Sequence, residues 1–150
     1  MRAVSDENLL MQDATARRLS RLHRLLYRVS GGVLGRRLVG NDMLLLTTRG
    51  RLSGRPHTVP LLYLEDKGRL VVIASWGGRP HHPQWYLNLL ADPRATVQAR
   101  TKRWPVRART ADADERQQWW PRAVIAYEGY ETYQSRTDRV IPVVFLEAEL

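Results

Sequence analysis

The sequence contains no cysteine, and this absence removes several classes of chemistry at once. Disulfide bonds, thiolate metal sites and cysteine nucleophiles are all excluded. No apolar run approaches the roughly 18 to 20 residues that a membrane-spanning helix needs, and no apolar block resembling a secretory signal follows the first residues. These absences favour a cytoplasmic protein.

Lysine is also scarce, because only Lys67 and Lys102 are lysines among the 24 basic residues. The arginine excess gives the chain a net charge of +9. Residues 1–40 alone carry eight arginines against three acidic residues, a net charge of +5. Such a charge indicates an anionic partner, and a phosphorylated cofactor, an acidic membrane surface and nucleic acid all qualify.

The 150 residues, 43% of them hydrophobic, are enough for one domain with a core. In residues 6–29 leucines recur at steps of three and four between arginines, which predicts a basic amphipathic helix that ends at Gly31 and Gly32. We therefore predict an N-terminal helical arm over residues 1–40 and a cofactor-binding barrel domain over residues 41–150. Two roles stay open for the arm: it lies on an anionic membrane, or it packs across one end of the barrel.

Short strands separated by turns dominate the sequence after residue 43. Alternating apolar residues predict strands at 43–49, 57–64, 69–75, 95–100, 104–110 and 141–146, with a tight turn at 65–68. Helices are predicted at 83–90, at 112–127 with a capping box that starts at Asp112, and in a short segment from Gly129. This order favours a mainly β, α+β fold with an antiparallel barrel. A Rossmann sheet is disfavoured, because strands and helices do not alternate and no G-x-G-x-x-G follows a strand.

The segment Thr47–Pro60 concentrates positive charge at one turn. It holds Arg49, Arg51 and Arg55 among glycines and has no acidic residue. Glycines let backbone N–H groups converge on an anion, and arginines supply forked, charged donors. The segment therefore predicts a hairpin whose tip binds an anion, although a solvated basic turn explains the same composition.

Two further clusters lie at turns of the chain. After the strand at 69–75, a glycine pair precedes a short helix, and the aromatic rings of Trp76, Trp85 and Tyr86 could wall a flat ligand. Three tyrosines at positions 127, 130 and 133 share one helical face and could direct their hydroxyls to one spot, or simply pack there. The neighbouring His81 and His82 point in different directions and lack a carboxylate at helical spacing, so no metal site is predicted.

These three clusters together resemble a known family. The segments TTRGRLSGRPHTVPLLYL, VVIASWGGRPHHPQWYLNLLADP and YEGYETYQSRTDRVIPVVFLE are similar to the deazaflavin-dependent nitroreductases of actinobacteria, over about residues 43–147. The resemblance implies a split β-barrel like those of flavin reductases and pyridoxamine oxidases. It also implies an oxidoreductase that binds coenzyme F-420, an 8-hydroxy-5-deazaflavin, and no metal.

The resemblance also implies roles for individual residues. The cofactor's phosphate and acidic tail would be held by Arg51, Leu52, Ser53, Gly54, Arg55, Pro56 and His57. Its ring would be lined by Ile73, Ala74, Ser75, Trp76, Gln84, Trp85, Tyr86, Leu87, Asn88 and Tyr130. The catalytic residues bordering the substrate would be Tyr130, Tyr127, Tyr133 and Ser75. The sequence departs from the family pattern at Leu52, His57 and Trp76, where lysine, arginine and lysine are common.

The family implies hydride transfer from reduced coenzyme F-420 to a small hydrophobic acceptor: an activated alkene, a quinone or a nitro compound. It also implies a cytoplasmic enzyme, in peripheral contact with the inner face of the membrane through residues 6–40. A different class stays open, a non-catalytic barrel that holds a lipid, haem or another flavin. Nucleic-acid binding is not expected, since the aromatic residues gather in loops rather than between basic residues on strands.

Overall fold

Seven strands and three α-helices make up residues 43–149, the part of the chain that the computed structural model describes. The predicted arm over residues 1–40, and hence the division of the chain into arm and barrel, lies outside the described residues. The strands are β1 (Met43–Arg49), β2 (Pro56–Leu62), β3 (Leu64–Asp66), β4 (Arg69–Ile73), β5 (Arg94–Ala99), β6 (Lys102–Thr110) and β7 (Val143–Ala148). The helices are α3 (Gln84–Ala91), α4 (Ala113–Ala126) and α5 (Gly129–Ser135), and a 3₁₀ turn, η1, spans Trp76–Gly78.

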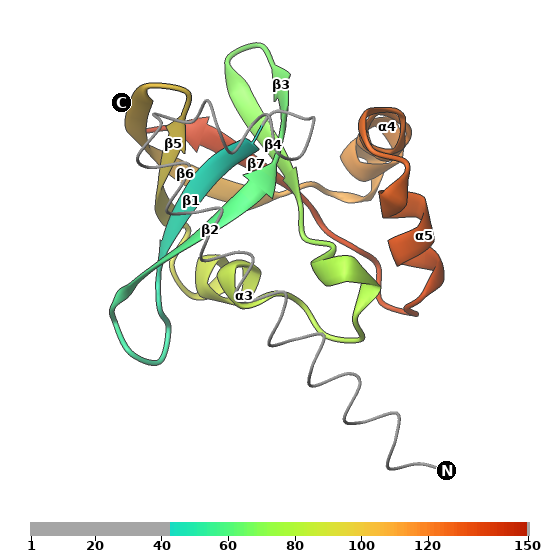
Figure 1. Ribbon diagram of the computed structural model, residues 1–150, viewed down its shortest axis with the longest axis horizontal. Helices are drawn as coiled ribbons and strands as arrows, with labels where there is room; N and C mark the ends of the chain where they lie inside the picture. Colours follow the sequence, from blue (N-terminus) through green and yellow to red (C-terminus); the bar gives the residue numbers. More distant parts are fainter. Residues whose placement is uncertain (1–42, 150) are drawn as a thin grey trace.

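All seven strands belong to one antiparallel sheet, in the order β2-β1-β5-β6-β7-β4-β3. The sheet curls (Figure 1), so side chains of β1, β4, β5, β6 and β7 meet in a shared interior. The predicted α+β class with an antiparallel barrel is confirmed. The sheet stays open between β2 and β3, the two strands at its ends.

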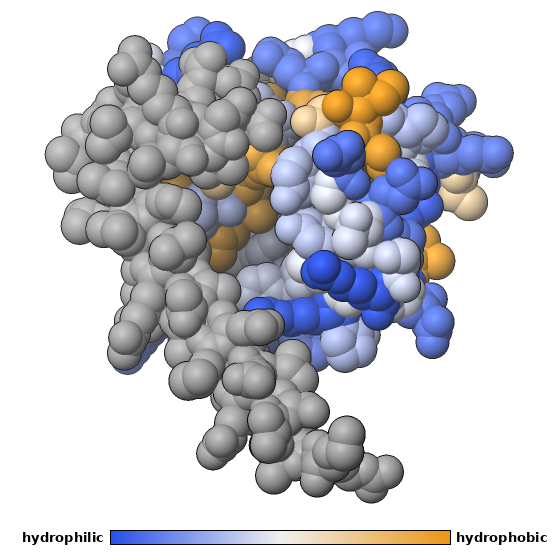
Figure 2. Space-filling model, turned by 45° about the vertical axis from the view of Figure 1, so that its right-hand side comes forward, coloured by the Kyte–Doolittle hydropathy of each residue, from blue (hydrophilic) through white to orange (hydrophobic). Residues whose placement is uncertain are grey.

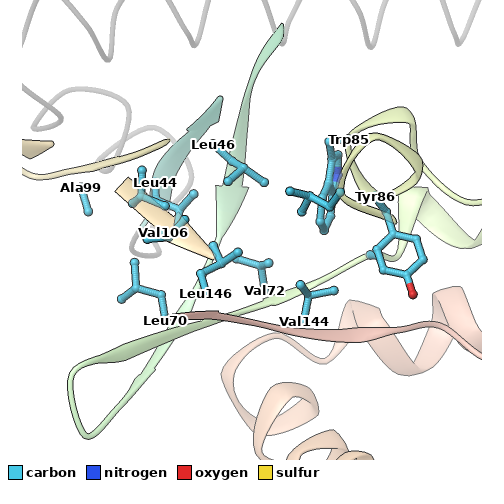
Figure 3. Close-up of a cluster of buried hydrophobic side chains, with 13 residues drawn as sticks. Leu44, Leu46, Leu70, Val72, Trp85, Tyr86, Ala99, Val106, Val144 and Leu146 are labelled. Atoms are coloured by element: carbon cyan, nitrogen blue, oxygen red, sulfur yellow. The ribbon is translucent and has the colours of Figure 1, made fainter. Parts of the chain in front are cut away.

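The interior of the curled sheet is an apolar core closed at one end by α3. Strand residues alternate between the two faces of a sheet, so every second residue points inward. The inward set is Leu44, Leu46, Leu70, Val72, Val97, Ala99, Val106, Val144 and Leu146, all at least nine-tenths buried. From α3, Trp85 and Tyr86 reach into this inner core (Figure 3).

A second core lies on the outer face of β4 and β7, under α4 and α5. Its strand residues are Val71, Ile73, Val143 and Phe145, and the helices contribute Trp119, Ala123 and Tyr130. The predicted capping box starts α4, because the Asp112 carboxylate accepts from the Glu115 N–H at 2.8 Å and the Glu115 carboxylate accepts from the Asp112 N–H at 3.1 Å. The sheet thus separates two apolar layers, one beside α3 and one beside α5.

The predicted turn at residues 65–68 is wrong in its first half. Lys67 and Gly68 alone form the turn, with φ of 51° and 83°. Because both residues have positive φ, they match the mirror-image turns that suit the twist of a two-residue hairpin. Glu65 and Asp66 are thereby left in β3, where they pair with Leu70 and Arg69.

Few large apolar side chains of residues 43–149 are exposed. They are Leu52, Leu90, Ile125 and Val140. On the face shown in Figure 2, hydrophilic side chains predominate and apolar ones form a few separate patches. Within residues 43–149 the structure contains no helix both long and apolar enough to cross a membrane.

Candidate functional site

The loop between β1 and β2 is closed by its own backbone and presents its arginines outward. The Gly50 N–H donates to the Arg55 carbonyl and the Gly54 N–H donates to the Gly50 carbonyl, both at 2.8 Å. Gly54 has a φ of 71°, a conformation that favours glycine. Residues 51–57 are all exposed, and Leu52 has 90% of its surface exposed. The predicted anion-binding tip is therefore an ordered turn rather than a simple extension of the strands.

A buried amide fastens this loop to α3. Asn88 on α3 is only 4% exposed, and its Oδ1 accepts from the Arg51 backbone N–H at 3.2 Å and from the Arg51 guanidinium at 3.0 Å. Its Nδ2 donates to the Thr48 hydroxyl at 3.1 Å. The basic loop and the first helix after the glycine pair therefore form one continuous region.

The segment after β4 folds into a tight left-handed turn. Trp76, Gly77 and Gly78 have φ of 46°, 64° and 77°, and Trp76 is a non-glycine residue in this strained region. The Arg79 guanidinium lies 4.4 Å from the centre of the Trp76 ring, a cation–π contact. Trp76 and Ser75 are both half-buried, so each keeps a surface that a ligand can contact.

This turn lies directly against α5. A side chain at position 78 would collide with the Tyr133 backbone carbonyl, so the close approach of the two segments requires glycine there. The Arg136 guanidinium also donates to the Gly77 carbonyl at 3.4 Å. The second and third sequence clusters are therefore neighbours.

The three tyrosines form one aromatic cluster with unequal exposure. Their ring centres lie 5.1 to 6.4 Å apart, and the hydroxyls of Tyr127 and Tyr133 form a hydrogen bond of 3.2 Å. Tyr130 is only 5% exposed, and burial raises the pKa of its phenol far above the usual value. The pKa of Tyr133 is also raised, first by its hydrogen bond with Tyr127 and then by burial. The raised pKa values keep the phenols of Tyr130 and Tyr133 protonated at neutral pH, so both can donate hydrogen bonds.

The predicted site residues are thus only partly assembled on one surface. The hairpin loop contacts α3 through Asn88, and η1 contacts α5 through Gly78. Trp85 and Tyr86, however, point into the inner core, while Ile73 and Tyr130 belong to the outer core. Along the predicted ring-lining segment the side chains that reach the surface are those of Ser75, Trp76, Gln84 and Leu87.

Sequence reasoning missed Arg139, which lies just before β7. Its guanidinium donates to the backbone carbonyls of Ala74, Ser75 and Arg79 and contacts the ring of His82. No pattern in the sequence distinguishes this arginine from the others, because its partners are backbone atoms about 60 positions away. Within residues 43–149, no group of three or more histidine, aspartate and glutamate side chains is placed to hold a metal ion.

Comparison with known proteins places this architecture in a class and a family. A pyridoxamine 5′-phosphate oxidase-type protein of Listeria innocua has the same split-barrel fold, with a TM-score of 0.53 at 13% identity over 75% of this chain and 88% of that one. The sequence matches the F420H(2)-dependent quinone reductase family over residues 19–148, and the chain belongs to that family. The predicted split barrel and the predicted family resemblance are both confirmed.

Relatives at higher identity agree. An F420H(2)-dependent quinone reductase of Mycobacterium tuberculosis is 39% identical over 132 residues, which cover 85% of this chain and 89% of that protein. A solved structure of an F420-H2 dependent reductase is 44% identical, with a TM-score of 0.65 over 71% of this chain and 94% of that one. The protein is accordingly an oxidoreductase that uses reduced coenzyme F-420 as hydride donor and a quinone as acceptor.

The Asn88 link generates a first prediction. Asn88→Ala should lower the free energy of unfolding by about 1 to 3 kcal/mol, because the buried Thr48 hydroxyl loses its donor. Urea unfolding of Asn88→Ala, Thr48→Val and the double variant measures this as a double-mutant cycle. Strictly additive losses would show that the two side chains are not coupled.

Proposed function

We propose that the basic hairpin loop and the turn after β4 form the two ends of one coenzyme F-420 site. In this assignment Arg51 and Arg55, with the backbone from Ser53 to His57, hold the phosphate and acidic tail. Ser75, Trp76 and the α3 residues from Gln84 to Asn88 border the ring. The observation that carries the proposal is Asn88, which ties the Arg51 backbone to the helix that would border the ring.

The residues present suit an anionic tail. Arg49, Arg51 and Arg55 surround one loop, and the ion pairs within residues 43–149 include none of them. The pKa of Asp92 is lowered first by its hydrogen bonds with Arg94, and the Asp92 carboxylate is near enough to Arg49 for that charge to lower it further. Arg51 and Arg55 have no such neighbour among the described residues. Asn88 holds the Arg51 guanidinium by a neutral oxygen at 3.0 Å, so its charge is oriented but not neutralised. Arginine forks in this state bind phosphate and carboxylate groups by charge-assisted hydrogen bonds.

Coenzyme F-420, when bound in its reduced form, supplies the hydride. The chain's own residues must then place the acceptor and stabilise the negative charge that develops on its oxygen. In the cluster of Tyr127 and Tyr133, one hydroxyl donates to the other, which leaves one phenol proton for a ligand. We assign to these two residues the hydrogen bond, or the proton, that the quinone oxygen needs.

Tyr130 has a different position from its two neighbours. It is buried beneath them, with Tyr127 and Tyr133 rings 5.1 and 6.4 Å away. In the proposal it supports these rings, while its predicted direct contact with cofactor and substrate stays a prediction. Activated alkenes and nitro compounds are proposed as further acceptors, because they also develop negative charge when they accept a hydride.

The hairpin assignment predicts that Arg55→Gln weakens coenzyme F-420 binding about tenfold, or ~1.4 kcal/mol, through the loss of one charge-assisted contact. Cofactor fluorescence titration at low and high salt measures it, and salt should narrow the difference by screening an exposed charge. Arg103→Gln is the matched control, since this exposed arginine pairs with Gln98, towards the opposite end of β1 and β5. Equal losses in the two variants would contradict the assignment.

The tyrosine assignment predicts that Tyr133→Phe, and more strongly Tyr127→Phe with Tyr133→Phe, lowers kcat for menadione by at least about tenfold. The dissociation constant of the cofactor should stay within about twofold, because the phenols act on the acceptor. The rate is followed by the return of oxidised-cofactor absorbance. Tyr63→Phe, between β2 and β3, is the control. An unchanged kcat in the double variant would remove the tyrosines from the reaction.

We also infer a place of action, the cytoplasmic face of the membrane. A hydrophobic quinone acceptor and the net charge of +5 over residues 1–40 support it. The full chain should sediment with vesicles that contain anionic lipid and not with neutral ones, and added salt should release it. Equal sedimentation with both kinds of vesicle, or with neither, would contradict the inference.

A further inference from the structure

One side chain holds most of the segment between β4 and α3. The Arg139 guanidinium donates from Nη2 to the Ser75 carbonyl at 2.6 Å, from Nη1 to the Ala74 carbonyl at 3.2 Å and from Nε to the Arg79 carbonyl at 2.8 Å. Its Nη1 also lies 3.0 Å from Nδ1 of His82. All of these acceptors lie within residues 74–82, which we call the Arg139-bound loop.

The hydrogen-bond partners of the Arg139 guanidinium within residues 43–149 are three backbone carbonyls and a histidine ring, none of them a carboxylate. No carboxylate of residues 43–149 forms an ion pair with it. Arg139 is half-buried, and its guanidinium donates to three carbonyls at once. An arginine can donate to several separated carbonyls at once, because its five N–H groups are spread over three nitrogens in a fixed plane. A lysine carries all its donors on one nitrogen and cannot span the same carbonyls.

The Arg139-bound loop has little internal hydrogen bonding to keep its strained backbone in place. Its centre contains three successive residues with positive φ, and one of them is Trp76. Within the loop the backbone supplies only the bonds from the Gly78 N–H to Ser75 at 2.9 Å and from the Arg79 N–H to Trp76 at 3.3 Å. Strained backbone persists where surrounding contacts fix it, and here the carbonyls at both ends of the strained stretch are fixed by Arg139.

We propose that Arg139 is a positioning residue for the reductase: it fixes the loop of residues 74–82 in the shape that receives the deazaflavin ring. The inference rests on the proposed function, because it takes this loop as the ring-binding one. Arg139 acts through the carbonyls of Ala74, Ser75 and Arg79, and it requires no contact of its own with cofactor or acceptor.

Because His82 can be protonated, its contact with Arg139 makes the hold on the Arg139-bound loop depend on pH. Nδ1 accepts from Arg139 only when the imidazole is neutral, and a protonated ring would place a second cation beside the guanidinium. The other groups that face His82 are the Tyr86 ring, at 4.9 Å, and His81, whose Nδ1 lies 3.4 Å from the His82 carbonyl. Burial and then Arg139 lower the pKa of His82 below its ordinary value of 6.5. Arg139 therefore makes all four contacts at neutral pH, and the contact with His82 is lost as the pH falls through that lowered pKa.

Arg139→Lys tests the proposal against Arg69→Lys. Arg69 is a matched control, because it is also half-buried but lies at the other end of β4, where it pairs with Asp66 and stacks on Phe145. Amide hydrogen exchange of the ligand-free proteins should be faster in residues 75–79 of Arg139→Lys than of Arg69→Lys. Coenzyme F-420 should bind Arg139→Lys about tenfold or more weakly than the wild type, and Arg69→Lys within about twofold.

The pH dependence of cofactor affinity distinguishes a positioning role of Arg139 from a purely structural one. In the wild type, cofactor affinity should fall as the pH is lowered below 6.5, because the pKa of His82 lies below that value. His82→Asn keeps an acceptor for Arg139 but does not titrate, so its affinity should fall less. Titration of the cofactor itself affects both proteins equally. This comparison holds even where Arg139→Lys fails to fold.

Two outcomes would contradict the inference. The first leaves the proposed cofactor site intact, and the second contradicts that site as well. If exchange and affinity change equally in Arg139→Lys and Arg69→Lys, or if His82→Asn keeps the full pH dependence, Arg139 is only structural and the cofactor site stands. If coenzyme F-420 binds the wild type without slowing exchange in residues 74–82, the loop does not receive the ring, and the proposed site fails together with the inference.

Discussion

The arrangement of the molecule depends on one buried amide that must keep all its hydrogen bonds. Asn88 is almost fully covered, and a buried polar group without partners costs about 1 to 3 kcal/mol. Its partners come from the last part of β1 and from the loop that follows, so satisfying Asn88 fixes α3 against the basic loop. The inner core below α3 then supplies the apolar burial that holds this arrangement in place.

The sheet divides the chemistry between its two faces. Helix α3, to which Asn88 bonds the arginine loop, packs on the inner side, and the tyrosines pack on the outer side with α5. The turn at η1 joins the two, because it follows β4 directly and lies against the Tyr133 backbone. A glycine at position 78 permits this approach, and Arg139 holds the carbonyls on either side of it. The backbone of η1 therefore connects the region of the arginine loop and α3 with the tyrosine cluster beside α5.

Much of the fold could be predicted from the sequence, because local patterns determine it. Alternation in residues 43–49 and 95–100, and the capping box at Asp112, act over a few residues and were readable directly. The two-residue length of the turn at Lys67 and the contacts of Arg139 were not, since the first depends on a positive φ at a lysine and the second on carbonyls distant in sequence. The side-chain directions of Trp85 and Tyr130 also depend on which face of the sheet each helix covers.

Trp76 shows that the chain does not minimise its own energy at every position. A bulky residue with a φ of 46° costs on the order of 1 kcal/mol relative to glycine, yet its ring stacks under the Arg79 guanidinium. Selection for heat resistance alone would favour glycine at this position, whereas selection for turnover would retain the indole, because the stacked pair borders the proposed ring site. Laboratory evolution under each pressure would thus drive position 76 in opposite directions, which makes it a natural marker of the trade-off between robustness and catalysis.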